Sequence, residues 1–62
     1  MTEKTILTQG VYRVTEVYDS DVGIYVQHLY KNGREVNVNS QGWSMTQEEA
    51  RQHIAEYESF NF

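Results

Sequence analysis

The sequence predicts an α+β fold: a small antiparallel sheet of three strands, with one C-terminal helix packed on one face. Two observations carry this prediction. Residues 11 to 39 contain segments in which β-branched and aromatic residues alternate with polar ones, separated by turn residues. A helix-capping pattern then precedes a segment whose apolar residues recur at spacings of three and four. Residues 5–8 are a candidate for a fourth, N-terminal edge strand.

The chain has 62 residues, and this length allows one hydrophobic core. We expect a single domain over residues 1–62, with the folded unit at about 5–58 and short loose ends. A domain of this size buries only about 60% of the surface that its unfolded chain exposes. Because the sequence contains no cysteine, disulfides cannot offset this thin core, whereas oligomerisation still can.

The first two strands are expected to form a hairpin. Residues 11–18 alternate in the manner of a strand, and residues 24–30 alternate again. Between them, Asp19-Ser20-Asp21-Val22-Gly23 has the composition of a turn. The same five residues resemble the start of a calcium loop, but no acidic residue closes that loop, so a plain turn is the better interpretation.

A second hairpin has the strongest local signal in the chain. Asn32-Gly33 supplies the two residues with positive φ that a type I′ turn requires. A third strand therefore runs from Arg34 to about Asn39, with Val36 and Val38 expected to face the core.

The helix is predicted from Gln47 to about Glu58. Thr46 and Glu49 have the spacing of a capping box, and Met45 is placed to pack on Ala50 as a hydrophobic staple. Trp43 is expected to plug the junction between sheet and helix. The inner face of the helix comprises Ala50, His53, Ile54 and Tyr57.

One helix covers one face of a small sheet and leaves the other face open. We expect the helix to lie over Val14, Ile24, Val26, Val36 and Val38. The open face is then expected to carry Val11, Arg13, Thr15, Val17, Tyr25, Gln27, Leu29, Glu35 and Asn37. On this face Val17, Tyr25 and Leu29 would form a binding patch; the alternatives are ordinary exposed surface or cover by the N-terminal segment.

Catalysis and metal binding find little support in the sequence. His28 and His53 are both expected to face the core, but two imidazoles make only half a zinc site and no metal-binding spacing accompanies them. The four glycines are isolated at turns, so there is no phosphate-binding loop. We therefore expect no enzyme, no metal and no cofactor.

The net charge of −4 comes mostly from the C-terminal part of the chain. This part contains one basic residue, Arg51, and the acidic residues Glu48, Glu49, Glu56 and Glu58. Acidic proteins are poor ligands for phosphate backbones, so the charge favours protein partners over nucleic acid. The tail ends on Phe60 and Phe62. These rings either fold back on the core, which we prefer, or dock into a partner.

The strand and hairpin at residues 24–32, followed by Thr46-Gln47-Glu48-Glu49-Ala50, are similar to the arm-type DNA-binding domains of phage and transposon integrases. This resemblance covers about half of the chain and implies nucleic-acid binding by the sheet. Those domains are basic, whereas Glu35 accompanies Arg13 on the open face expected here.

These observations lead us to expect a small protein-binding module, a regulator or inhibitor of a larger protein and of the phage or mobile-element type. It is expected to be cytoplasmic, with no membrane segment. The residues expected to bind the partner, on the open face and the acidic helix, are Arg13, Val17, Tyr25, Leu29, Glu48 and Glu56.

Two alternatives remain open for this chain. One is nucleic-acid binding by the sheet through Arg13, Lys31, Arg34 and Tyr25. The other is a structural protein that forms a homodimer through the open face.

Overall fold

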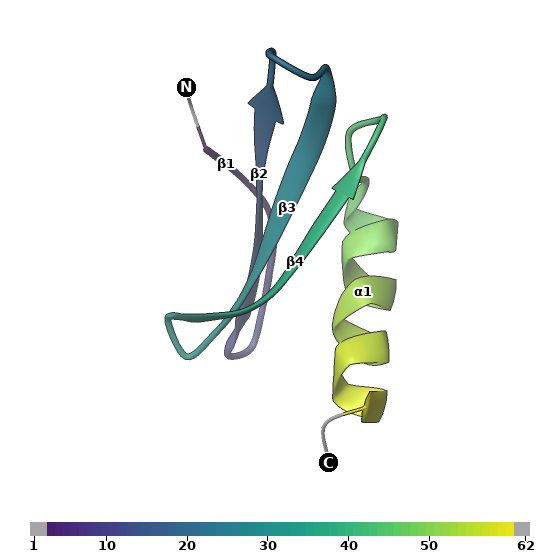
Figure 1. Cartoon of the computed structure of the whole chain (residues 1–62). Coiled ribbons are helices and arrows are strands. Elements are labelled where there is room, and N and C mark those ends of the chain that lie inside the picture. The colour runs from purple at the N-terminus through teal and green to yellow at the C-terminus, as the bar shows by residue number, and fades with distance from the viewer. Residues whose placement is uncertain (1–2, 61–62) are drawn as a thin grey trace.

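A computed structural model describes residues 3–60 and has the predicted α+β fold, including the fourth strand (Figure 1). The strands are antiparallel and lie in chain order, so each strand neighbours the next. The helix follows the last strand and covers one face of the sheet. The elements are β1 (Lys4–Gln9), β2 (Tyr12–Asp19), β3 (Ile24–Lys31), β4 (Arg34–Gln41) and α1 (Gln47–Phe60).

The turns form as their residue types predict. Asn32 and Gly33 have φ of 54° and 79° between the paired residues Lys31 and Arg34, which fits the predicted type I′ hairpin. In the β2–β3 turn, the Gly23 amide donates to the Asp19 carbonyl at 2.8 Å. The Asp21 amide donates to the Asp19 carboxylate at 3.0 Å, so this carboxylate supports a turn.

Two strand irregularities direct extra apolar side chains toward the helix. Ile6 has no residue directly opposite it in β2, and Val36 has no residue directly opposite it in β3. A bulge of this kind re-aims a side chain out of strict alternation. Ile6 is buried as a result, and Val36 packs against the core.

The core lies between α1 and the sheet. As predicted, Ala50 and Ile54 are buried on the inner face of the helix, and the half-buried Tyr57 packs edge-on against Tyr12 with ring centroids 6.3 Å apart. The buried apolar residues are Ile6, Tyr12, Val14, Leu29, Met45, Ala50 and Ile54.

The predicted orientation of β3 is wrong. Val14 lies directly opposite Leu29, and Val17 lies opposite Val26. Opposed residues point to the same side of a sheet, so Leu29 joins Val14 under the helix while Val26 faces away from it. Leu29 has 0% of its surface exposed. The row on the open side is therefore Ile24, Val26, His28 and Tyr30, and the row under the helix is Tyr25, Gln27 and Leu29.

The prediction for β4 is half right. Val36 faces the core, but Val38 pairs with His28 on the open side and is 51% exposed. Asn37 lies opposite Leu29 and so belongs to the helix side. The slip at Val36 causes this change, because an extra residue reverses the alternation beyond it.

The start of the helix matches the prediction, but Trp43 does not plug the junction. The Glu49 amide donates to the Thr46 hydroxyl at 3.1 Å, and the Thr46 amide donates to the Glu49 carboxylate at 3.0 Å, which completes a capping box. Met45 is buried, while Trp43 is 61% exposed and its indole donates to Glu49. Met45 closes the junction in place of Trp43.

The preferred position of the C-terminal aromatic residues is also corrected. Phe60 is 86% exposed at the end of α1, so this ring does not fold back into the core. Phe62 lies outside the described residues.

Candidate protein-binding face

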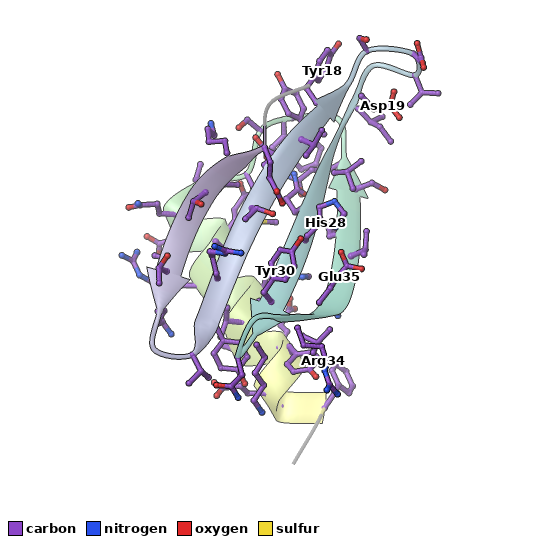
Figure 2. All side chains as sticks on the ribbon, turned by 90° about the vertical axis from the view of Figure 1, so that its left-hand side faces the viewer. Tyr18, Asp19, His28, Tyr30, Arg34 and Glu35 are labelled. Atoms are coloured by element: carbon purple, nitrogen blue, oxygen red, sulfur yellow. The ribbon has the colours of Figure 1, made fainter. Side chains whose placement is uncertain are left out.

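The sheet presents one face away from α1, and we call it the open face (Figure 2). Its side chains follow from the strand register. They are Thr5 and Thr8 on β1, Arg13, Thr15, Val17 and Asp19 on β2, Ile24, Val26, His28 and Tyr30 on β3, and Glu35, Val38 and Ser40 on β4.

Tyr30 is at the centre of a polar cluster on the open face. Its hydroxyl donates to a Glu3 carboxylate oxygen at 3.4 Å, and the Thr15 hydroxyl donates to the same oxygen at 2.5 Å. The Arg13 guanidinium lies 5.1 Å from the centroid of the Tyr30 ring, in cation–π geometry. These contacts hold the ring and the guanidinium in place.

The surroundings of Tyr30 favour the protonated form of its hydroxyl. Burial raises the pKa of Tyr30 above its ordinary value of 10.0, and the negative charges of Glu3 and Glu35 raise it further, outweighing Arg13. Near neutral pH a tyrosine is protonated in any case, so the shift extends the donor form only toward higher pH.

His28 and Glu35 form a second polar contact beside Tyr30. The His28 Nδ1 atom lies 2.6 Å from a Glu35 carboxylate oxygen, and the two side chains are 27% and 46% exposed. The residues come from neighbouring strands, and both point out of the open face (Figure 2). The contact orients the imidazole at the surface.

Apolar side chains occupy the part of the open face nearer the β2–β3 turn. Val17 and Val26 are directly opposed, and Val38 on β4 is opposite His28, the next residue after Val26 in the same row of β3. Val17, Ile24 and Val26 are half-buried, whereas Val38 is exposed. The open face thus joins an aliphatic patch, which comprises Val17, Ile24, Val26 and Val38, to the polar cluster around Tyr30.

The residues predicted to bind a partner do not share one surface. Arg13 and Val17 lie on the open face as expected. Tyr25 lies on the helix side, where its ring centroid is 4.8 Å from that of Tyr18, and Leu29 is buried in the core. Glu48 and Glu56 are exposed on α1, behind the sheet in Figure 2.

Sequence reasoning missed the contacts of Tyr30 and the pair formed by His28 and Glu35. An Asn-Gly turn places Tyr30 opposite Glu35, so the hairpin signal alone could have identified this neighbourhood. It was missed because His28 and Tyr30 were assigned to the face under the helix.

One carboxylate is buried on the helix side of the sheet. Glu16 is 4% exposed and accepts hydrogen bonds from the Ser44 hydroxyl (2.6 Å), the Met45 amide (2.7 Å) and the Gln27 amide group (2.8 Å). Burial raises the pKa of Glu16, but these donors and the positive charge of Lys4 outweigh burial and lower it overall. Glu16 ties the sheet to the start of α1.

The described residues form neither a metal site nor a basic surface suited to nucleic-acid binding. His28 and His53 lie on opposite sides of the sheet, and residues 3–60 contain no group of three or more His, Asp or Glu side chains that could hold a metal ion. Lys31 is on the helix side, with its ammonium 5.7 Å from the Tyr12 ring centroid. The structure therefore separates Lys31 and Tyr25 from Arg13.

Comparisons of the chain with protein-family models, with curated proteins and with solved structures find no match. Within residues 3–60, no helix is both long enough and apolar enough to cross a membrane.

Proposed function

We propose that this protein is a small protein-binding module that docks on a larger protein through its open face and regulates or inhibits that protein. The observation that supports the proposal is the composition of this face, where an aliphatic patch borders an ordered cluster of Tyr30, Arg13 and His28. Binding interfaces commonly have such an apolar centre with a polar rim.

The order of the polar cluster favours binding. Tyrosine and arginine are enriched among residues that dominate binding energy, because their large side chains fill pockets on a partner. Here Tyr30 and Arg13 are already held by Glu3 and by each other. Immobilising a flexible side chain on binding costs about 0.5–1.5 kcal/mol of free energy. Because Tyr30 and Arg13 are already ordered, they lose little additional side-chain entropy when they contact a partner.

The charge of the open face indicates the chemistry of the partner. Glu3 and Glu35 reach this face, whereas Arg13 is its one cation among the described residues. The exposed acidic residues of α1, including Glu48 and Glu56, add to the negative potential. We therefore assign a partner whose docking surface is apolar at its centre and basic at its rim, a charge pattern that speeds association.

Affinity capture from a host lysate tests this proposal, with and without nuclease. Arg13→Ala and Val26→Lys alter the open face, and Arg51→Ala is the matched control because it removes the same charge from the exposed face of α1. We expect one stoichiometric protein that survives nuclease treatment, at least about tenfold weaker binding by both open-face variants, and unchanged binding by the control. Recovery of nucleic acid alone, or equal capture by all variants, would overturn the proposal.

A further inference from the structure

The two edges of the sheet differ in how well they are protected against pairing with another strand. β1 is interrupted by the bulge at Ile6, and the side-chain amide of Gln47 donates to the Ile6 carbonyl at 3.1 Å. The helix also lies against β1. Bulges, an edge lysine such as Lys4 and cover by another element are known protections of an edge.

β4 lacks these protections over most of its length. From Asn37 to Gln41 its register with β3 runs without interruption, and this stretch, Asn-Val-Asn-Ser-Gln, contains no charge and no proline. In the described part of the chain β4 pairs with β3 alone, so the backbone N–H and C=O groups of alternate residues point outward. A regular, uncharged edge of this kind is a template for another strand.

A groove runs beside this edge, between β4 and α1. Its volume is about 490 Å³. The Nε2 atom of His53 is buried and has no hydrogen-bond partner within residues 3–60. Because this atom is buried, it does not itself offer a contact to an occupant of the groove. The lining residues are Val36, Asn37, His53, Glu56, Tyr57 and Phe60.

Two exposed aromatic side chains mark the two ends of β4. Phe60 lines the groove together with Val36, near the start of the strand. Trp43 follows the end of the strand, where its carbonyl accepts a hydrogen bond from the Gln41 side chain at 2.9 Å. Phe60 and Trp43 are 86% and 61% exposed. Phe60 is thus a large exposed apolar group beside β4, and such groups are typical of an interface.

We propose that β4 is the interface of a homodimer, in which β4 of a second copy pairs antiparallel with it about a two-fold axis near Val38. In this register Val38 faces its own counterpart and Asn37 faces Asn39 of the other copy. The two sheets become one continuous sheet. Each edge that is open in the monomer is then paired.

A second copy fits this surface because the surface is self-complementary. Antiparallel pairing about Val38 brings the end of one β4 beside the start of the other, so Ser40 and Asn39 of the second copy lie opposite Val36 and Asn37, two residues that line the groove. The uncharged stretch from Asn37 to Gln41 sets no like charges against each other. Dimerisation also offsets the thin core of a chain of 62 residues.

This interface goes beyond the proposed partner binding and uses the β4 edge of the sheet. Val38 is the one residue of the aliphatic patch that lies at both surfaces. The open face, including Arg13 and Tyr30, stays accessible in the dimer. The dimer would present two copies of that face on one sheet.

Sedimentation velocity of the purified protein, from about 10 µM to about 1 mM, tests the proposal. We expect the mass to rise from 7.3 kDa toward twice that value. Val38→Lys and Val38→Glu each place like charges on the two-fold axis, and each should weaken association at least about tenfold. Mixing the two variants should restore a heterodimer, because the opposed charges then attract.

The controls separate this surface from others. Val22→Lys adds the same charge at another exposed valine, in the β2–β3 turn, and it should dimerise as the wild type does. Far-UV circular dichroism checks that each variant is folded. A wild type that stays monomeric up to about 1 mM would overturn the proposal, as would a dimer that both Val38 variants leave intact. Because no partner is present, this outcome is independent of the capture experiment.

Discussion

Glu16 shows how a single buried charge stabilises this fold. The carboxylate lies under the helix side of the sheet and accepts hydrogen bonds from Ser44, Met45 and Gln27. Gln27 in turn accepts a hydrogen bond from Asn39 at 2.7 Å. A buried carboxylate is costly unless donors satisfy it, and here the donors come from two separate segments of the chain, β3 and the loop before α1.

Replacing Glu16 with glutamine should destabilise the protein. The amide cannot accept from all of these donors as a carboxylate does, and hydrogen bonds to a charged group contribute about 1.5–3 kcal/mol each. We expect a loss of roughly 2–3 kcal/mol in the free energy of unfolding, measured by urea denaturation. Glu48→Gln is the matched control: Glu48 is exposed in the first turn of α1, so its loss should cost at most about 1 kcal/mol. Equal losses in both variants would contradict this role.

The lowered pKa of Glu16 also predicts a pH dependence. Burial acts against ionisation, yet the donors and Lys4 lower the pKa below its ordinary value of 4.5, so the ionised form is favoured in the folded state. The contribution is complete above pH 4.5 and is lost as the pH falls through the folded-state pKa. The free energy of unfolding should therefore decrease below this pH.

The comparison that isolates this effect is the wild type against Glu16→Gln, each denatured with urea from neutral pH downward. The variant should lose less stability on acidification. A residual loss is expected from Glu49, whose pKa is lowered by the Thr46 amide and the Trp43 indole. Parallel curves for the two proteins would show that Glu16 does not contribute to the pH dependence.

At the scale of the elements, local signals predicted which segments are strands and helix. The Asn32-Gly33 turn and the capping box of Thr46 and Glu49 each satisfy backbone groups within a few residues, so neighbouring sequence is sufficient to specify them. The elements formed as expected because these local preferences agree with the global fold.

The faces of β3 and β4 could not be predicted in the same way. One row of β3 holds Ile24 and Val26 and the other holds Tyr25 and Leu29, so both rows are apolar enough to face a core. A slip of one residue exchanges the rows, and the register depends on the turn between Asp19 and Ile24. The bulge at Val36 has no local signal either.

Two substitutions on neighbouring strands test the observed faces. Leu29→Ala removes a fully buried side chain and should cost about 2–5 kcal/mol in the free energy of unfolding. Val38→Ala, on the exposed side of β4, should cost less than about 1 kcal/mol for the protein studied at a concentration where it is monomeric. Urea denaturation measures both. A larger loss from Val38→Ala would favour the orientation that the sequence alone suggested.

For the whole molecule, small size makes each of these contributions important. The described chain is elongated, with principal extents of 36 × 18 × 17 Å, and one helix shields one face of the sheet. In domains of this length, a loss of 1 kcal/mol lowers the melting temperature by about 4–8 °C. The sequence predicted this sensitivity from length alone, whereas the surfaces proposed to bind partners depend on strand faces and edges that only the structure places.

Hydrogen exchange of the β4 amides gives the last prediction, because it reports on the assembled state of the whole molecule. Amides that point toward β3 should exchange slowly at all protein concentrations, since the β3–β4 ladder holds them. Between Asn37 and Gln41, the intervening amides point outward and should exchange fast in the monomer. As the protein concentration rises, β4–β4 pairing should slow the outward amides in proportion to the dimer fraction. Because the Val38→Lys variant is expected to remain monomeric, its outward amides should stay fast. Outward amides that are equally fast in the wild type at every concentration would show that β4 remains a free edge, and would leave the open face as the one proposed binding surface.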